Sequence, residues 1–92
     1  MILIIDGKKQ HRLTLSSIPV TIGRAPDNVI VVDDDFCSQI HLELRLENGK
    51  VYFKDLGSKN GTYLNHFKYE QGILDQGDLL EIGRVRISLA EN

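Results

Sequence analysis

The sequence predicts an all-β domain, built either as a sandwich or as a barrel. Apolar and β-branched residues fall into many short runs, and glycine, proline, asparagine, aspartate or serine separates one run from the next. No stretch of helical length is amphipathic, and the chain contains no repeat and no linker. Many short strands with frequent turns between them are typical of these two architectures.

The first part of the chain has the clearest strand patterns. Asp6-Gly7 and Asn48-Gly49 are strong hairpin signals. Val29–Val32 is a row of β-branched residues, which indicates a short buried strand, and Ile40–Glu47 alternates apolar with polar residues, which indicates a half-buried one. The strands predicted here are Met1–Ile5, His11–Leu15, Val20–Ile22, Val29–Val32, Ile40–Glu47 and Val51–Leu56.

The last part of the chain is predicted to form shorter strands and one irregular crossing. Gly72–Asp78 is rich in turn residues, and Ile73 and Leu74 are its apolar anchors. Gly83-Arg84 joins the last two strands. The strands predicted here are Thr62–Asn65, Phe67–Tyr69, Leu79–Ile82 and Val85–Leu89.

Size and charge limit the classes of function. A chain of 92 residues is enough for one domain, so we expect residues 1–92 to fold as a single unit. The formal net charge of −2 gives no overall attraction to nucleic acid or to an anionic membrane. Any anion site must therefore be a local arrangement of cations and backbone donors.

The cysteine content and the N-terminal residues indicate the cellular compartment in which the protein is expected. Cys37 is the only cysteine, which excludes an internal disulfide and indicates a reducing compartment. The apolar N-terminal run stops at Asp6-Gly7, too early for a signal peptide or a membrane span. We expect a cytoplasmic protein in which Cys37 is a small packed residue. A start at Met1 and an end after Asn92 suit an N-terminal module of a longer protein.

The stretch from Asp55 to Thr62 carries the most informative chemistry. Two glycines free the backbone beside a hydroxyl, an ammonium and a carboxamide, which suits a loop that folds around an anion. Asn-Gly alone is also a common tight turn. Two further segments, Ile22-Gly23-Arg24 and Ser38-Gln39-Ile40-His41, add a guanidinium and a second hydroxyl. Together the three segments predict a site for a phosphorylated peptide.

Five motifs follow one another along the chain with short spacings. They are Gly23-Arg24, Ser38-x-x-His41, Gly57-Ser58-Lys59-Asn60-Gly61-Thr62-x-x-Asn65, Gly77-Asp78 and Ile82-Gly83. In this order they resemble the forkhead-associated (FHA) domain over nearly the whole chain. The resemblance implies a β-sandwich of two twisted, mainly antiparallel sheets with binding loops at one end. It also implies a module that binds phosphothreonine peptides without catalysis, cofactor or metal, after an upstream Ser/Thr kinase has phosphorylated the partner.

The resemblance implies roles for individual residues. Arg24 matches the arginine that contacts phosphate, Ser38 the serine whose hydroxyl donates to it, and Asn60 the asparagine that hydrogen-bonds the peptide backbone. Gln39 and Lys59 occupy loop positions that border the phosphate. The implied phosphopeptide-binding residues are thus Arg24, Ser38, Gln39, Ser58, Lys59 and Asn60. Those implied to brace the loops are Gly23, His41, Gly61 and Thr62, and Ser58 matches this group as well.

Two positions depart from the family pattern. Gln39 stands where the family frequently has arginine or lysine, a charge that Lys59 could replace from the neighbouring loop. His66 stands where glycine often follows asparagine, although histidine tolerates a positive φ better than most residues. These departures keep a second function open, that of a degenerate scaffold that binds an unmodified protein partner through a sheet face.

Other classes of function fit the sequence less well. Ser38 and His41 are three apart on a predicted strand and would point to opposite faces, which is poor geometry for a nucleophile and its base. His11, His41 and His66 lack zinc spacing, and no basic stripe or aromatic platform suggests nucleic acid. Asp33-Asp34-Asp35 lacks a calcium-loop pattern and is expected to be solvated. As a hypothesis, these charges favour basic residues in the bound peptide.

Overall fold

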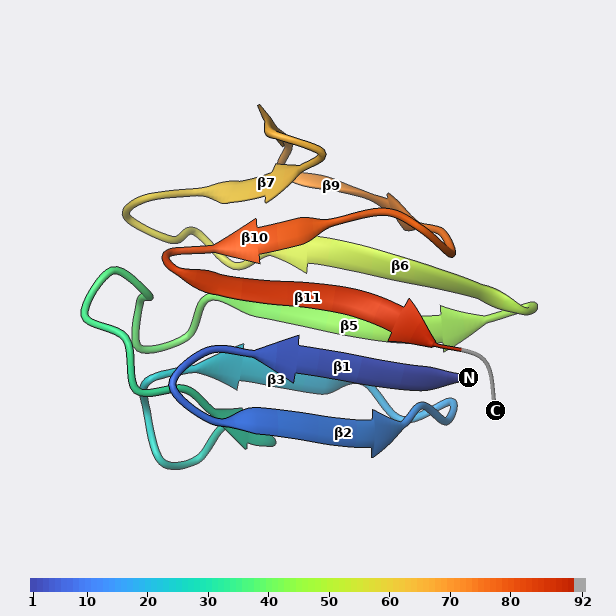
Figure 1. Ribbon diagram of the computed structural model, residues 1–92, viewed down its shortest axis with the longest axis horizontal. Coiled ribbons are helices and arrows are strands. Elements are labelled where there is room, and N and C mark those ends of the chain that lie inside the picture. Colours follow the sequence, from blue (N-terminus) through green and yellow to red (C-terminus); the bar gives the residue numbers. More distant parts are fainter. Residues whose placement is uncertain (91–92) are drawn as a thin grey trace.

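The computed structural model describes residues 1–90 and is a sandwich of two sheets (Figure 1). In sheet order, the first contains β2 (Gln10–Thr14), β1 (Ile2–Asp6), β11 (Val85–Ala90), β10 (Leu80–Ile82), β7 (Thr62–Leu64) and β8 (Phe67–Lys68). The second contains β4 (Ile30–Val31), β3 (Val20–Gly23), β5 (Leu42–Glu47), β6 (Lys50–Asp55) and β9 (Gln71–Leu74). Every described pairing is antiparallel except that of β3 with β4. The predicted sandwich is confirmed, and the alternative of a barrel is excluded.

The core lies between the two sheets and is built from alternate residues of the central strands. Leu3 and Ile5 of β1 and Ile87 of β11 are fully buried on the side of the first sheet, and Leu42 and Leu44 of β5 on the side of the second. Burying each such side chain contributes about 1.5–3 kcal/mol. Nothing in residues 1–90 forms an apolar helix of membrane-spanning length.

The loops that carry the residues of the expected site gather at one end of the sandwich. The turns that follow β1, β3, β4, β6 and β10 lie together at the left of Figure 1. Arg24, Ser38 and Asn60 belong to three of these loops. Met1 lies at the opposite end, where Ile2 pairs with Ala90. The predicted gathering of these loops at one end is confirmed.

The segment predicted as an irregular crossing, Gly72–Asp78, overlaps strand β9 (Gln71–Leu74), so the prediction was wrong for residues 72–74. This strand pairs with β6 and places Gly72 opposite Phe53. A Cβ at residue 72 would lie 2.8 Å from the Phe53 ring, so the glycine makes room for a core aromatic side chain at the edge of the sheet. A glycine that serves packing carries the same sequence signal as one that serves a turn.

Two strand predictions are longer than the strands that form. Ile40 is 49% exposed while His41 is fully buried, and β5 begins only at Leu42. The predicted strand Val29–Val32 shortens to Ile30–Val31, and Val29 is exposed. At His41 the period-two pattern fails, because two hydrogen bonds hold its ring inside the fold. From Val29 to Val32 exposed and buried residues still alternate, so this segment is half-buried and the expectation of a fully buried strand was wrong.

Candidate functional site

The loop after β3 is anchored by the close approach of two backbones. A Cβ at residue 23 would lie 2.3 Å from the Gln39 carbonyl oxygen, so only glycine fits at Gly23. Arg24 N donates to Ser38 O at 3.0 Å, and Arg24 Nε donates to Cys37 O at 2.6 Å. The exposed guanidinium is therefore held by one of its N–H groups, and its two terminal nitrogens can still donate to a ligand.

Asn28 closes the same loop, and the sequence analysis did not single it out. Its Nδ2 donates to the carbonyl oxygens of Ala25 and Gln39, each at 2.8 Å, and the residue is 9% exposed. Gln39 thus contributes its backbone to the scaffold while its side chain remains exposed. Asn28 reads as a turn residue, and its partners are backbone groups that only folding brings together.

Ser38 is fixed by two hydrogen bonds that leave its hydroxyl free to donate. Ser38 N donates to His41 Nδ1 at 3.0 Å, and Ser38 Oγ accepts from Lys59 N at 3.0 Å. Because Oγ only accepts here, its own hydrogen is available to a ligand. Residues 38–41 form a bend before β5, so the expectation that they lie on an extended strand was wrong. The imidazole meets the backbone of Ser38 and not its hydroxyl, so the two residues form no nucleophile–base pair.

His41 connects several chain segments from a fully buried position. Since Nδ1 accepts from Ser38, Nε2 carries the proton and donates to Gly61 O at 2.8 Å. The backbone of His41 also donates to Ile22 O at 3.0 Å and accepts from Leu56 N at 2.9 Å. One residue therefore joins the ends of β3 and β6 to the loops on either side.

Asp55 accepts most of the hydrogen bonds that hold the loop between β6 and β7. The sequence analysis did not assign it a role in the site. Its Oδ1 accepts from the hydroxyls of Ser58 at 2.6 Å and Thr62 at 2.7 Å. Its Oδ2 accepts from the backbone N–H groups of Gly57 at 3.1 Å and Ser58 at 2.9 Å. Ser58 Oγ accepts in turn from Gly61 N at 2.9 Å, where φ is +89°. The Ser58 hydroxyl is thus engaged on both sides within the loop.

These bonds set the charge state of Asp55. Burial raises the pKa of its carboxyl, but the hydroxyls of Ser58 and Thr62 and the Ser58 N–H outweigh burial, so that the pKa lies below its usual value. The loop is built around an ionised carboxylate. An aspartate followed by hydroxyl residues three and seven positions later was the available signal, since short polar side chains cap nearby backbone donors.

Lys59 and Asn60 lie exposed at the tip of this loop. Asn60 Nδ2 donates to Phe36 O at 2.9 Å, which joins the tip to the neighbouring loop. None of the ion pairs within residues 1–90 involves Lys59 or Arg24. Two uncompensated cations beside a hydroxyl and a carboxamide suit an anionic ligand. The residues brought to this surface are Arg24, Ser38, Lys59 and Asn60.

Comparison with known proteins identifies the family. Residues 20–83, more than half of the chain, match the model of the FHA domain. The chain belongs to the FHA family. The FHA domain-containing protein FhaB of Mycobacterium tuberculosis is 42% identical to it over 79 residues, which are 85% of this chain and 51% of FhaB. The glycogen accumulation regulator GarA of Mycolicibacterium smegmatis is 40% identical over 76 residues, 83% of this chain and 48% of GarA. This FHA chain thus spans about half the length of these curated relatives.

Solved FHA domains share the whole sandwich. The FHA domain of FhaA, crystallised in complex with the intracellular domain of Rv3910, has a TM-score of 0.85 and 29% identity, and covers 95% of this chain and 96% of its own. The FHA domain of CT664 from Chlamydia trachomatis also has a TM-score of 0.85, at 21% identity, over 100% of this chain and 99% of its own, and shows the shared fold. The family indicated by the sequence motifs is confirmed.

Proposed function

We propose that this FHA domain binds phosphothreonine-containing segments of other proteins and so recruits them in Ser/Thr kinase signalling, without catalysis. The observation that carries the proposal is the joining of three loops that expose Arg24, the Ser38 hydroxyl and Asn60. The complex of the FhaA domain with the intracellular domain of Rv3910 supports a protein as the partner. The proposed binding requires neither a cofactor nor a metal.

The phosphate is proposed to sit against Arg24, Ser38 and Lys59. A guanidinium presents a planar fork to phosphate oxygens, and each charge-assisted hydrogen bond contributes about 1.5–3 kcal/mol. The bond from Arg24 Nε to Cys37 O holds the side chain before the ligand arrives, so less rotamer freedom is lost on binding. Lys59 supplies a second positive charge on the side where Gln39 supplies none.

The remaining site residues are proposed to position the peptide and the loops. The Asn60 carboxamide can exchange its bond with Phe36 O for bonds with the peptide backbone. Because the Ser58 hydroxyl is already engaged on both sides, we assign Ser58 to bracing, together with Gly23, His41, Gly61 and Thr62. A threonine γ-methyl packed between the loops would favour phosphothreonine over phosphoserine by about 1 kcal/mol.

Titration calorimetry with one peptide in phosphothreonine, phosphoserine and unmodified forms tests the proposal. We expect micromolar affinity, about −8 kcal/mol, for the phosphothreonine form, and weaker or absent binding for the others. Arg24→Ala should weaken binding at least tenfold, whereas Arg86→Ala, an exposed arginine of β11, should leave it unchanged. Equal binding of all three forms would contradict phosphate recognition.

A second candidate function is a phosphate-independent adaptor, and the exposed aromatic side chains favour it. Phe67 on the edge strand β8 is 68% exposed, and Tyr69 just after it is 47% exposed. Aromatic residues are enriched in protein interfaces. On this alternative, an unmodified partner binds, and Phe67→Ala abolishes its binding while Arg24→Ala does not.

We further propose that residues 1–92 act as one folded unit in the cytoplasm. A single core shared by both sheets supports one unit, and the free thiol of Cys37 is compatible with a reducing compartment. A single cooperative unfolding transition in urea and the location of a fluorescent fusion in cells test these two statements.

A further inference from the structure

A groove runs between the edges of the two sheets. It lies beside the three loops that carry Arg24, Ser38 and Lys59, which we call the phosphate loops. Its floor is apolar and buried, made of Ile5, Val32 and Val85, and the half-exposed Val31 forms a wall. Lys8 and Lys9 of the turn between β1 and β2 line its rim. The volume of about 330 Å³ is at the lower end of the range for ligand pockets, so the groove suits a few side chains. We name it the flanking groove.

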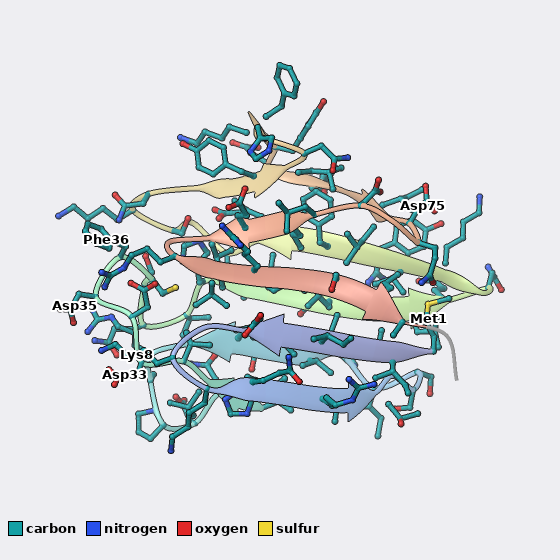
Figure 2. All side chains as sticks on the ribbon, in the orientation of Figure 1. Met1, Lys8, Asp33, Asp35, Phe36 and Asp75 are labelled. Atoms are coloured by element: carbon teal, nitrogen blue, oxygen red, sulfur yellow. The ribbon has the colours of Figure 1, made fainter. Side chains whose placement is uncertain are left out.

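A second hollow of about 290 Å³ continues the flanking groove toward the phosphate loops. It is lined by Asp34 and Arg84 and shares Gly7, Lys8 and Asp33 with the groove. Figure 2 shows Phe36, Asp35, Lys8 and Asp33 at the same end of the sandwich.

Arg84 and Phe36 connect this hollow with the phosphate site. The guanidinium carbon of Arg84 lies 4.7 Å from the centre of the Phe36 ring, and Phe36 O accepts from Asn60 Nδ2 at 2.9 Å. The surface is therefore continuous from Asn60, through Phe36 and Arg84, into the flanking groove. A segment of the partner bound at Asn60 can therefore follow this surface into the groove in an extended conformation.

Two of the three consecutive aspartates beside this path, Asp33 and Asp34, are paired with cations. Asp34 is only 4% exposed, which contradicts the expectation that it is solvated. It accepts from Phe36 N at 2.9 Å and Arg84 N at 2.7 Å, and the Arg84 guanidinium lies 3.4 Å away. Asp33 pairs with Lys8 Nζ at 3.4 Å. Only Asp35 is both exposed and outside the ion pairs of residues 1–90.

The rim of the groove carries more positive than negative charge. Lys8 and Lys9 stand against a single carboxylate, Asp33, and none of the ion pairs in the described part of the chain involves Lys9. A cationic rim over an aliphatic floor complements an aliphatic side chain next to an acidic one.

We infer that the flanking groove binds a segment of the partner that lies beside the phosphothreonine. In this segment an aliphatic residue is adjacent to an aspartate or a glutamate. The aliphatic side chain packs against Val31 and the floor, and the carboxylate lies at Lys9. This inference rests on the proposed function and adds the sequence class of the partner. It is opposite to the preference for basic residues that three solvated aspartates would have produced.

The test uses a reference phosphothreonine peptide flanked by alanine. Leu-Glu, Leu-Lys or Ala-Ala pairs are placed at successive positions on either side of the phosphothreonine, and calorimetry measures each Kd. At one position, we expect the Leu-Glu peptide to bind about fivefold or more tightly than the Ala-Ala peptide, and the Leu-Lys peptide to gain less.

Variants assign the gain to the groove. Lys9→Glu should remove the gain for Leu-Glu and transfer it to Leu-Lys, a reversal that general destabilisation cannot produce. Val31→Thr keeps a β-branched side chain in β4 but should reduce the gain from leucine. Neither variant should change the Kd of the reference peptide. Lys50→Glu makes the same charge change at the first residue of β6, at the far end of the sandwich, and should change no preference (Figure 1).

The outcomes separate the two proposals. If the reference peptide binds through Arg24 but the flanking pairs make no difference at any position, the inference is wrong and phosphate recognition stands. If Leu-Lys binds best to the wild-type domain, the inference is also wrong. If no phosphothreonine peptide binds at all, phosphate recognition fails and the inference fails with it.

Discussion

The Nε2 of His41 lies 2.8 Å from the carbonyl oxygen of Gly61, so that one imidazole joins the loop of Ser38 to the loop of Asn60. His41→Ala removes this bond, leaves Ser38 N without its acceptor and opens a cavity at a fully buried site. We expect a loss of about 2–4 kcal/mol in the free energy of unfolding, with weaker phosphopeptide binding. Urea denaturation and calorimetry measure both effects. Ile40→Ala, at an exposed neighbour, should cost less than about 0.5 kcal/mol, and equal costs would contradict the bracing role.

Acid should loosen the domain through Asp55 and Asp34. The pKa of each carboxyl is lower in the fold than its ordinary value of 3.8, so the unfolded chain binds protons first as the pH falls. The stabilisation is fully present above about pH 4 and is lost as the pH falls through the lowered values. Asp55→Asn should reduce stability at pH 7 and flatten the decline below pH 4. Thermal melts from pH 2 to pH 7 test this, and parallel curves for the two proteins would contradict it.

Gly23→Ala and Gly49→Ala should differ sharply in their effects. A Cβ at residue 23 would overlap the Gln39 carbonyl oxygen, so we expect a loss of at least about 3 kcal/mol or a failure to fold. At residue 49, no atom lies within 4 Å, and only the φ of +75° opposes alanine, at a cost of about 1 kcal/mol. Chemical denaturation ranks the two variants. A mild effect at residue 23 would mean that the two backbones can move apart.

Gln39→Arg should strengthen phosphopeptide binding. The side chain is exposed and uncharged, and the family resemblance implies that this loop position borders the phosphate. A guanidinium there should tighten binding about three- to tenfold at low salt and less at high salt, because exposed charges are screened. Calorimetry at two salt concentrations measures the change. Unchanged affinity would mean that residue 39 points away from the ligand.

Cys37 should be unreactive in the native protein. Burial raises the pKa of its thiol to about 12, and Sγ donates to Ile82 O at 3.3 Å. A thiol-specific disulfide reagent at pH 8 should therefore label it only after unfolding in urea. Rapid labelling without urea would show that the loop between β4 and β5 opens in solution.

The residues predicted from the sequence belong to short motifs, whereas those missed act through hydrogen bonds that no motif marks. Arg24, Ser38 and Asn60 were found because short motifs mark loops in the order in which the chain presents them. Asp55 was missed although its partners lie within seven positions, because an aspartate that caps nearby donors has the same sequence signal as an ordinary turn residue. Asp34 was taken for a solvated charge because Arg84, its partner, lies fifty positions further along the chain. Composition and spacing predict the scaffold, whereas burial of a polar side chain depends on contacts between distant segments.

The pairing of Ile2 with Ala90 has a practical consequence. Both ends of the described chain leave the sandwich on the side opposite the gathered loops, across a molecule whose longest extent is 31 Å (Figure 1). A tag at either terminus would fix the domain to a sensor surface with the phosphate loops directed toward solution. The same geometry allows a fluorescent reporter at either terminus without covering the ligand, so attached and free forms of the domain should give matching affinities.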